Sequence, residues 1–341
     1  MARIRIKPDG AILLGASVSC DGFAWDCPVR VQTHIHADHM LDFDTSKANQ
    51  TIVTSSPTLA LLYGLYNADL PHRSNLIGLD YGMGLTVNGD VLRLLPSNHM
   101  LGCAQVCVTC CDGYRVGYSS DFYWPLDEAI RVDELLVDAT YGEPGSTRNF
   151  TQQLVDEKLV SAVLGSEAAG KLTAVVGHNG RLQYALHILG QLLRVPIICS
   201  PKAFALVDVY RQHGYAIPMV LASDSDEGLE VLRSRQPCVA FITFHERRHL
   251  PWTDRFVKIA LSAHMANRDD PVLRYDNGDC CIALTDHADF DGTVAYIRAT
   301  GARLVWTDPR SGNAEALAVA VRERLGIECR TVERIVSLAW G

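Results

Sequence analysis

The chain has 341 residues, of which 48% are hydrophobic and 21% are charged, a composition typical of a globular protein with one large or two ordinary domains. Its formal net charge of −8 excludes a globally basic protein that binds nucleic acid by charge alone. No signal-peptide pattern follows the basic start, and no stretch reaches the roughly 18 apolar residues of a membrane span. We therefore expect a cytoplasmic protein without a membrane partner.

The first 145 residues predict short strands separated by turns rich in glycine and aspartate. The strand-like segments are residues 11–20, 51–57, 91–98, 104–111, 114–120 and 134–142. Residues 56–68 have helical periodicity instead. From residue 146 onward, amphipathic helices alternate with short apolar strands, which is typical of a parallel sheet covered by helices. The end of the chain predicts a strand, a loop, a helix and a strand over residues 280–309, and then a last helix.

The 11 cysteines are scattered along the chain and form no CxxC pair. In a reducing compartment, such cysteines are usually small buried side chains. The sequence therefore predicts neither a disulfide framework nor a structural cysteine–zinc site.

The segment "VQTHIHADHM", residues 31–40, places three histidines and an aspartate within six positions. It follows a β-rich segment, so the i, i+2 spacing of His34 and His36 directs both imidazoles to the same side. Asp38 and His39 follow as the chain turns. Two imidazoles suit a first zinc ion, and the adjacent carboxylate and imidazole suit a second ion nearby. A surface loop that happens to be rich in histidine is the weaker alternative.

A metal site of this kind needs further ligands at the ends of later strands. His99 follows one apolar strand and precedes a glycine, and Asp121 ends another strand. A carboxylate can bridge two cations through its two oxygens, whereas one imidazole nitrogen cannot. The order of these residues after the histidine-rich segment strengthens the prediction of a metal centre.

Together these motifs resemble the metallo-β-lactamase fold, through H-x-H-x-D-H at 34–39, "HMLGCAQV" at 99–106 and the strand-end Asp121. "VDATYG" at 137–142 resembles a signature of the β-CASP branch, whose members cut nucleic acids, and "GHNGRLQYALHIL" at 177–189 resembles a helix start of its inserted domain. "LTDHADFDGTVAYIRATGARLVWTDP" at 284–309 is most similar to bacterial ligase-associated DNA exonucleases. The resemblance implies an αββα metallo-β-lactamase sandwich from residues 1–145 and 277–341, with a β-CASP-like α/β domain inserted at 146–276.

The resemblance also implies roles for individual residues. His34, His36 and His99 would hold a first zinc ion, Asp38 and His39 would hold a second ion, and Asp121 would bridge the two. Mn²⁺ or Mg²⁺ is an alternative for the second ion. The catalytic residues would be Asp38, Asp138 and His287, with His287 as the general acid. A carboxylate beside an imidazole favours its protonated form, which can then donate a proton to the leaving oxygen.

One departure from the family concerns the end of the last strand. Relatives have Thr-His-Gly there, whereas this chain has Thr307, Asp308 and Pro309. Asp308 takes the place of a histidine that usually binds the second zinc ion, so we expect it to bind that ion through oxygen. DNA-repair members of the branch also lack this histidine. His264, in "LSAHMAN", is a second match to the general-acid motif, but no strand end follows it at the family's distance, so His287 is preferred.

Arg181, at a helix start with Gly177 and Gly180, allows two interpretations, a phosphate site or a tight strand-to-helix turn. Residues 244–250 either line a nucleic-acid groove or form a solvated charged face. Trp252 and Tyr141 could stack on a base, although buried aromatic side chains are commoner.

The sequence thus favours a metal-dependent nuclease, a DNA exonuclease acting in DNA repair or end processing with partners such as a ligase or a helicase. The alternatives are an RNA-processing β-CASP ribonuclease, a small-molecule metallo-hydrolase and an inactive nucleic-acid-binding relative. DNA is favoured over RNA because of the sequence of the last motif, residues 284–309, and the absence of its histidine.

Overall fold

The chain folds into two compact units, one of residues 1–147 with 287–341 and the other of residues 148–286. The computed structural model describes residues 3–247, 255–262, 269–310 and 312–332. These residues confirm the predicted mixed α/β class, with three sheets. None of the helices in the described ranges is long and apolar enough to cross a membrane. His264 and Trp252 lie outside the described residues, as do residues 248–250 of the charged segment.

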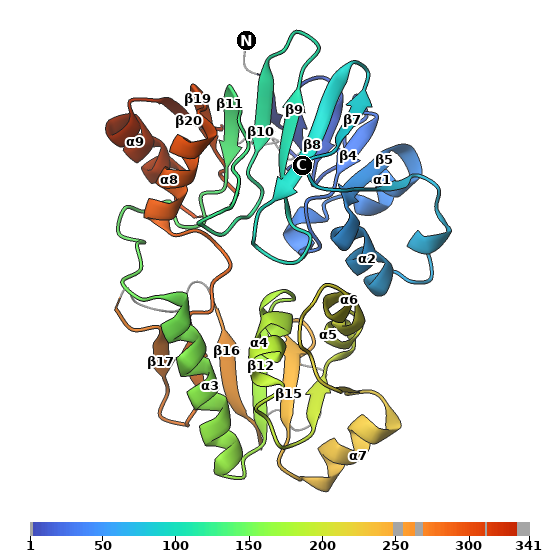
Figure 1. Ribbon diagram of the computed structural model, residues 1–341, viewed down its shortest axis with the longest axis vertical. Coiled ribbons are helices and arrows are strands. Elements are labelled where there is room, and N and C mark those ends of the chain that lie inside the picture. The colour runs from blue at the N-terminus through green and yellow to red at the C-terminus, as the bar shows by residue number, and fades with distance from the viewer. Residues whose placement is uncertain (1–2, 248–254, 263–268, 311, 333–341) are drawn as a thin grey trace, which may run out of the picture. The chain divides into compact units, whose positions relative to one another are not determined.

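The first unit begins with a six-stranded sheet whose strands follow one another in chain order; its residues are drawn in shades of blue in Figure 1. The strands are β1 (Ile4–Ile6), β2 (Ile12–Leu14), β3 (Val18–Cys20), β4 (Val29–Val31), β5 (Thr51–Ser55) and β6 (Leu76–Leu79). Pairing is parallel from β3 to β6. Helices α1 (Phe43–Asn49) and α2 (Ser56–Leu65) connect the last three strands and pack on β5 and β6.

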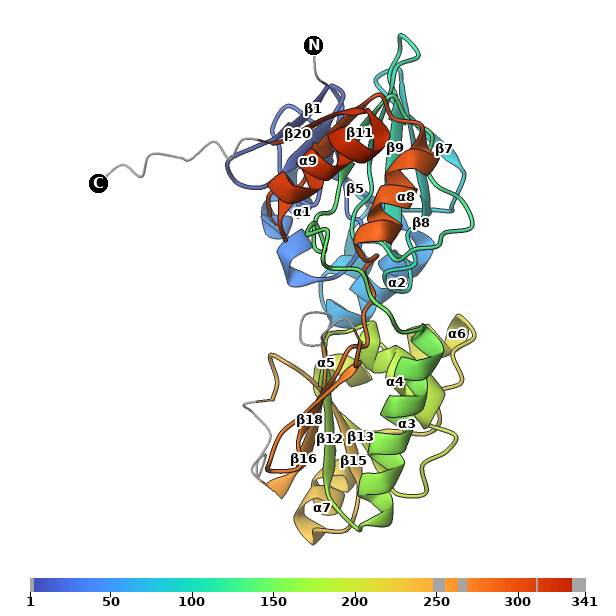
Figure 2. The same ribbon diagram turned by 90° about the vertical axis from the view of Figure 1, so that its left-hand side faces the viewer.

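A seven-stranded sheet forms the other half of this unit, in the order β20-β19-β11-β10-β9-β8-β7. The strands are β7 (Gly84–Val87), β8 (Asp90–Pro96), β9 (Ala104–Thr109), β10 (Arg115–Tyr118), β11 (Glu134–Val137), β19 (Leu304–Thr307) and β20 (Glu328–Thr331). Strands β10, β11, β19 and β20 run parallel. Helices α8 (Phe290–Thr300) and α9 (Ala314–Leu325) lie over this sheet in Figure 2.

The two sheets of the first unit pack face to face over a shared apolar core. Val18 and Val31 of the first sheet belong to the same buried cluster as Val106 and Val116 of the second. A separate cluster joins the outer face of the second sheet to α8 and α9. With α1 and α2 against the first sheet, the layers follow the order α, β, β, α, because each sheet buries both of its faces.

The second unit contains one seven-stranded sheet in the order β14-β13-β15-β12-β16-β18-β17. The strands are β12 (Thr173–Gly177), β13 (Ile197–Cys199), β14 (Leu221–Ala222), β15 (Val239–Thr243), β16 (Val257–Leu261), β17 (Val272–Arg274) and β18 (Cys280–Ile282). The helices are α3 (Gln152–Ala168), α4 (Arg181–Leu189), α5 (Pro201–Phe204), α6 (Val207–Gln212) and α7 (Asp226–Ser234). All strand pairs are parallel except β17 with β18, as the alternation of helices and strands predicted.

The return to the first unit differs from the predicted boundary of 276/277. Strand β18 pairs in parallel with β16 and is fully buried, so it completes the sheet of the second unit. The chain re-enters the first unit at His287. A short apolar strand carries no signal of which sheet it joins, and the sequence therefore placed it in the wrong unit.

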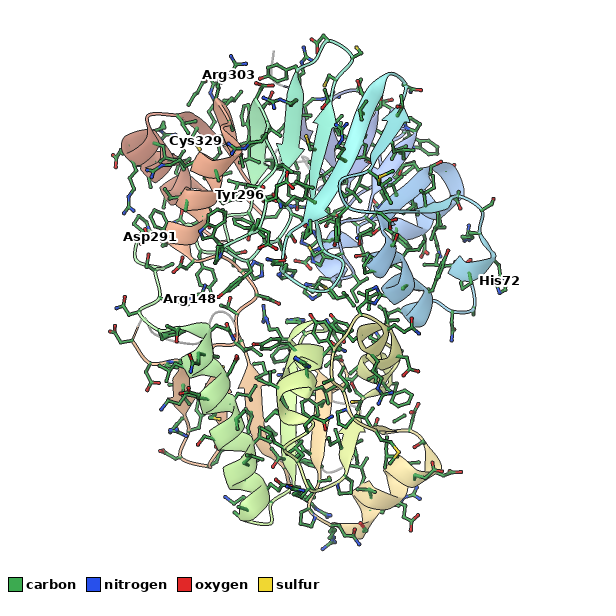
Figure 3. The ribbon with its side chains drawn as sticks, in the orientation of Figure 1. His72, Arg148, Asp291, Tyr296, Arg303 and Cys329 are labelled. Carbon is green, nitrogen blue, oxygen red and sulfur yellow. The ribbon has the colours of Figure 1, made fainter. Side chains whose placement is uncertain are left out.

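Buried polar contacts tie α8 to the loops of the second sheet. Tyr296, labelled in Figure 3, is fully buried, and its hydroxyl donates to Gln105 Oε1 at 2.9 Å. The amide nitrogen of Gln105 donates in turn to the Pro96 carbonyl at 2.6 Å. These bonds fix the end of β8, after which the chain enters the loop that carries His99.

The glycine of "TYG" is explained by close packing. A Cβ at Gly142 would lie 2.2 Å from the Asn313 carbonyl oxygen, whereas a Cβ at Gly145 would meet no atom within 4 Å. We predict that Gly142→Ala lowers the free energy of unfolding by about 1–3 kcal/mol, because the backbone before α9 must shift. Gly145→Ala is the matched control. Urea unfolding measures both variants, and equal stabilities would contradict this interpretation.

Candidate metal centre

The predicted site residues of the first unit follow the carboxyl ends of strands. His34 and His36 follow β4, His99 follows β8, Asp121 follows β10 and Asp138 follows β11. Strands β8 and β10 both pair antiparallel with β9, so they run in the same direction as each other. Their carboxyl ends therefore meet at the same edge of the sheet, where side chains from distant parts of the sequence come together.

His34, His36, His99 and Asp121 form one compact group. Each offers a ligand atom, and these atoms all lie within 4.8 Å of one another. His99 Nε2 lies 3.1 Å from His36 Nδ1 and 3.5 Å from Asp121 Oδ2. Nitrogen and oxygen donors in this number are the ligands that zinc and similar divalent ions prefer.

The state of His34 supports a bound cation. This side chain is fully buried, and its Nε2 has no hydrogen-bond partner among the described residues. Its Nδ1 lies 3.1 Å from the Thr33 hydroxyl, so Nε2 faces Asp121 Oδ2 at 3.7 Å. Burial, together with the neighbouring imidazoles, holds the pKa of His34 well below its usual value. A neutral imidazole with an unused lone pair is a metal ligand, and the group therefore fits a divalent metal site.

His39 lies between two carboxylates. Its Nδ1 is 2.7 Å from Asp21 Oδ2, and its Nε2 is 3.4 Å from Asp121 Oδ1. Burial opposes the charged form of His39, but Asp121 and Asp21 outweigh it and raise its pKa well above the usual value. Asp38 Oδ2 lies 3.8 Å from His39 Nε2, and its side chain is 80% exposed. Asp38 is therefore largely solvated and lies at the edge of the group.

Asp138 and His287 come together from positions far apart in the sequence. His287 Nδ1 lies 3.1 Å from Asp138 Oδ2, and His287 Nε2 lies 3.9 Å from Asp121 Oδ2. The other Asp138 oxygen accepts hydrogen bonds from the backbone and hydroxyl of Thr140 at 2.9 and 2.8 Å. The Thr140 contacts fix the carboxylate, and the carboxylate orients the imidazole toward the metal group.

Asp308 has a different partner from the one expected. Its carboxylate oxygens accept from Arg310 Nε at 3.0 and 2.9 Å and from Nη2 at 2.6 Å. Arg310 also donates to the Tyr118 hydroxyl at 2.8 Å. Asp308 is absent from the potential metal-ligating groups among the described residues, as are Asp38 and His39. Because the guanidinium occupies both oxygens, the arrangement favours a structural ion pair over the expected second-metal ligand.

Two residues near this site were missed by the sequence reasoning. Asp21 binds His39 and also accepts from the Thr33 backbone and hydroxyl. Arg30 is fully buried and donates to the His39 carbonyl. Like Asp121, Asp21 directly follows a β-rich segment. This position at a strand end is the sequence signal that could have identified it.

In the second unit, the start of α4 is a tight strand-to-helix turn. Gly180 has φ +93°, which favours glycine. The side chain of Arg181 donates to Asp286 in the same unit. This ion pair favours the turn over a phosphate site.

No protein-family model matches the sequence. An uncharacterized protein in the lig 3′ region of Acidianus ambivalens is 30% identical over 141 residues, which are 40% of this chain and 99% of that protein. This chain belongs to the same family. A probable DNA ligase of Opitutus terrae is 24% identical over 309 residues, which cover 87% of this chain but only 28% of the ligase.

Among solved structures, a protein of unknown function from Enterococcus faecalis superposes with a TM-score of 0.60 and 14% identity, over 90% of this chain and 79% of its own. This likeness shows a shared fold. A metallo-β-lactamase from Cronobacter sakazakii superposes with a TM-score of 0.30 and 16% identity, over 40% of this chain and 74% of its own.

Metal binding by this family member should release protons. The raised pKa of His39 means that an ion at this imidazole must displace a proton, so cation affinity should fall as pH falls. Calorimetric titration of metal-free protein with Zn²⁺, in buffers of different ionisation enthalpy, measures the release. His39→Ala should release fewer protons, and the exposed His72→Ala should behave as wild type. Binding that is independent of pH would contradict this role of His39.

Removal of the Asp308 carboxylate separates a structural role from a ligand role. Asp308→Ala should lower the free energy of unfolding by about 1–3 kcal/mol, because the largely buried Arg310 loses its acceptors. Cation affinity should stay unchanged. Urea unfolding and Zn²⁺ titration check the two expectations. A lower Zn²⁺ affinity with an unchanged free energy of unfolding would instead indicate that Asp308 is a metal ligand.

Proposed function

We propose that this chain is a metal-dependent phosphodiester hydrolase of the metallo-β-lactamase fold, with a β-CASP-like second unit, and that it acts as a DNA exonuclease in DNA repair or end processing. The αββα layers of the first unit support the fold assignment. The His34, His36, His99 and Asp121 group supports dependence on a divalent ion, and its nitrogen and oxygen donors favour zinc.

The observation that carries this proposal is the place of His287. One ring nitrogen lies 3.1 Å from Asp138, and the other lies 3.9 Å from the Asp121 carboxylate of the metal group. A histidine whose far nitrogen is held by a carboxylate is suited to proton transfer, and this one faces the metal group directly. Hydrolysis of a phosphodiester needs this combination of a proton donor and a cation at one place.

The geometry supports the following roles for the residues. A divalent ion held by His34, His36, His99 and Asp121 would supply a Lewis acid that activates water and neutralises charge on the phosphate oxygens. His287 would hold a proton on Nε2 and donate it to the departing oxygen, while Asp138 stabilises the imidazolium. His39 and the exposed Asp38 would hold a second ion, Zn²⁺, Mn²⁺ or Mg²⁺.

Support for DNA comes from the relatives. The sequence of this chain matches 28% of a protein named as a probable DNA ligase, and its Acidianus relative is named for the lig 3′ region. We infer that the protein acts on DNA ends in concert with repair proteins such as a ligase or a helicase.

Digestion of end-labelled single- and double-stranded DNA and RNA, with Zn²⁺, Mn²⁺ or Mg²⁺ added, tests the proposal. We expect DNA to be shortened from its ends and a chelator to stop the reaction. RNA cleavage without DNA cleavage would instead favour an RNA-processing ribonuclease, and inactivity on both polymers would contradict the proposed function.

Within the same assay, His287→Ala should lower turnover by about 10²–10⁴-fold, the usual contribution of a positioned proton donor. Zn²⁺ binding at the His34, His36, His99 and Asp121 group should remain, because His287 is not one of its four members. Asp138→Asn should also lower turnover. His72→Ala, in an exposed histidine that Figure 3 labels, is the control. Wild-type turnover in His287→Ala would remove this residue from the chemistry.

A further inference from the structure

Arg30 is a buried cation beside the metal-ligand loop, the segment from His34 to Leu41. It lies in β4 and is 0% exposed. Burial lowers its pKa to about 10, so the guanidinium still carries its charge near neutral pH. A fully buried charge is costly unless all its donors are satisfied, and the partners of this one therefore indicate what it does.

All five N–H groups of the Arg30 guanidinium have an acceptor, and none of these acceptors is a carboxylate. Its partners are the Gln32 side-chain oxygen at 3.1 Å from Nε and 2.7 Å from Nη2, the His39 carbonyl at 3.1 Å, the Leu41 carbonyl at 2.6 Å and the Ser46 hydroxyl at 3.0 Å. Two of these acceptors are main-chain carbonyls at the far end of the metal-ligand loop.

Gln32 completes the arrangement. Its oxygen is held by Arg30, so its amide nitrogen must point the other way. That nitrogen donates to the His34 carbonyl at 2.6 Å and to the His39 carbonyl at 3.0 Å. One amide group therefore joins the first and the last histidine of the H-x-H-x-D-H segment, and Arg30 fixes the amide in the orientation that allows this.

We propose that Arg30 and Gln32 are positioning residues that hold the metal-ligand loop in its ion-binding conformation before an ion arrives. This inference rests on the proposed metal site, but it does not depend on the nature of the substrate. An ordered loop spends no binding energy on rearrangement, so a cation binds more tightly. Lysine cannot replace the arginine fully, because one ammonium group cannot span the carbonyls and the amide together.

The arrangement also has an electrostatic consequence. Arg30 places a positive charge near the loop that binds a cation, which would oppose binding. The buried Asp21 carries the compensating charge, since it raises the pKa of Arg30 against the effect of burial and contacts His39 directly. The positive charge of Arg30, which holds the loop, is therefore offset by the negative charge of Asp21.

The experiment compares Arg30→Met, Arg30→Lys and Gln32→Glu with wild type. Gln32→Glu keeps an acceptor for Arg30 but loses the amide donor that joins His34 to His39, and it remains informative should Arg30→Met fail to fold. Gln183→Leu is the matched control, because Gln183 is an equally buried glutamine of the second unit whose side chain accepts from the Gly180 amide and donates to the Ala203 carbonyl.

Two measurements on the full chain are needed. Zn²⁺ affinity, in competition with a chromophoric chelator, should fall by about 10–100-fold in Arg30→Met and Gln32→Glu, the usual effect of removing groups that orient metal ligands. The Zn²⁺ affinity of Arg30→Lys should lie between the affinities of these variants and that of wild type. In metal-free protein, hydrogen exchange of the His39 and Met40 amides, which bond to the His36 and Ala37 carbonyls, should accelerate in the same variants.

Gln183→Leu should lose stability without a change in Zn²⁺ affinity or in exchange at His39 and Met40. Wild-type Zn²⁺ affinity in a folded Arg30→Met or Gln32→Glu protein would overturn the proposal and leave Arg30 a purely structural residue. A protein that binds Zn²⁺ as expected but cuts no nucleic acid would contradict the proposed function alone, and the positioning role would stand.

Discussion

A single partly buried carboxylate, that of Asp121, brings the parts of this site together. Imidazole nitrogens of His34, His39, His99 and His287 lie between 3.4 and 3.9 Å from its oxygens. Burial alone would raise the pKa of Asp121, but the surrounding imidazoles, His39 and His287 first, hold it well below its usual value. An ionised carboxylate beside several imidazole nitrogens offers the oxygen and nitrogen donors that a divalent cation prefers.

Further charges support this centre from within the first unit. Asp21 orients His39, Arg30 holds the backbone of the same loop, and the ion pair of Asp308 with Arg310 braces Tyr118. Each of these charges meets hydrogen-bonding partners within the first unit. Because burying an unmatched charge is costly, the arrangement constrains the positions of the site loops.

The path of the chain has a chemical consequence. The chain leaves the first unit after Thr147 and returns at His287, and the first residue after the return is the one that contacts Asp138. In the sequence, the second unit therefore lies between Asp138 and His287. Helix α8 begins immediately afterwards at the Asp289 cap, whose side chain accepts from the Gly292 amide at 2.9 Å, and this cap fixes the backbone next to His287.

The sequence by itself determined the α/β class and the clustering of ligands at strand ends. Strand periodicity and the dense H-x-H-x-D-H spacing are local signals, and parallel strands must deliver their carboxyl ends to one edge. Tertiary structure alone decided which sheet takes β18, because a short apolar strand fits either. It also decided the partner of Asp308, since Arg310 is two residues away but turns back only in the folded loop. Asp21 and Arg30 escaped the sequence reasoning for the same reason, because a buried charge is recognised by what surrounds it.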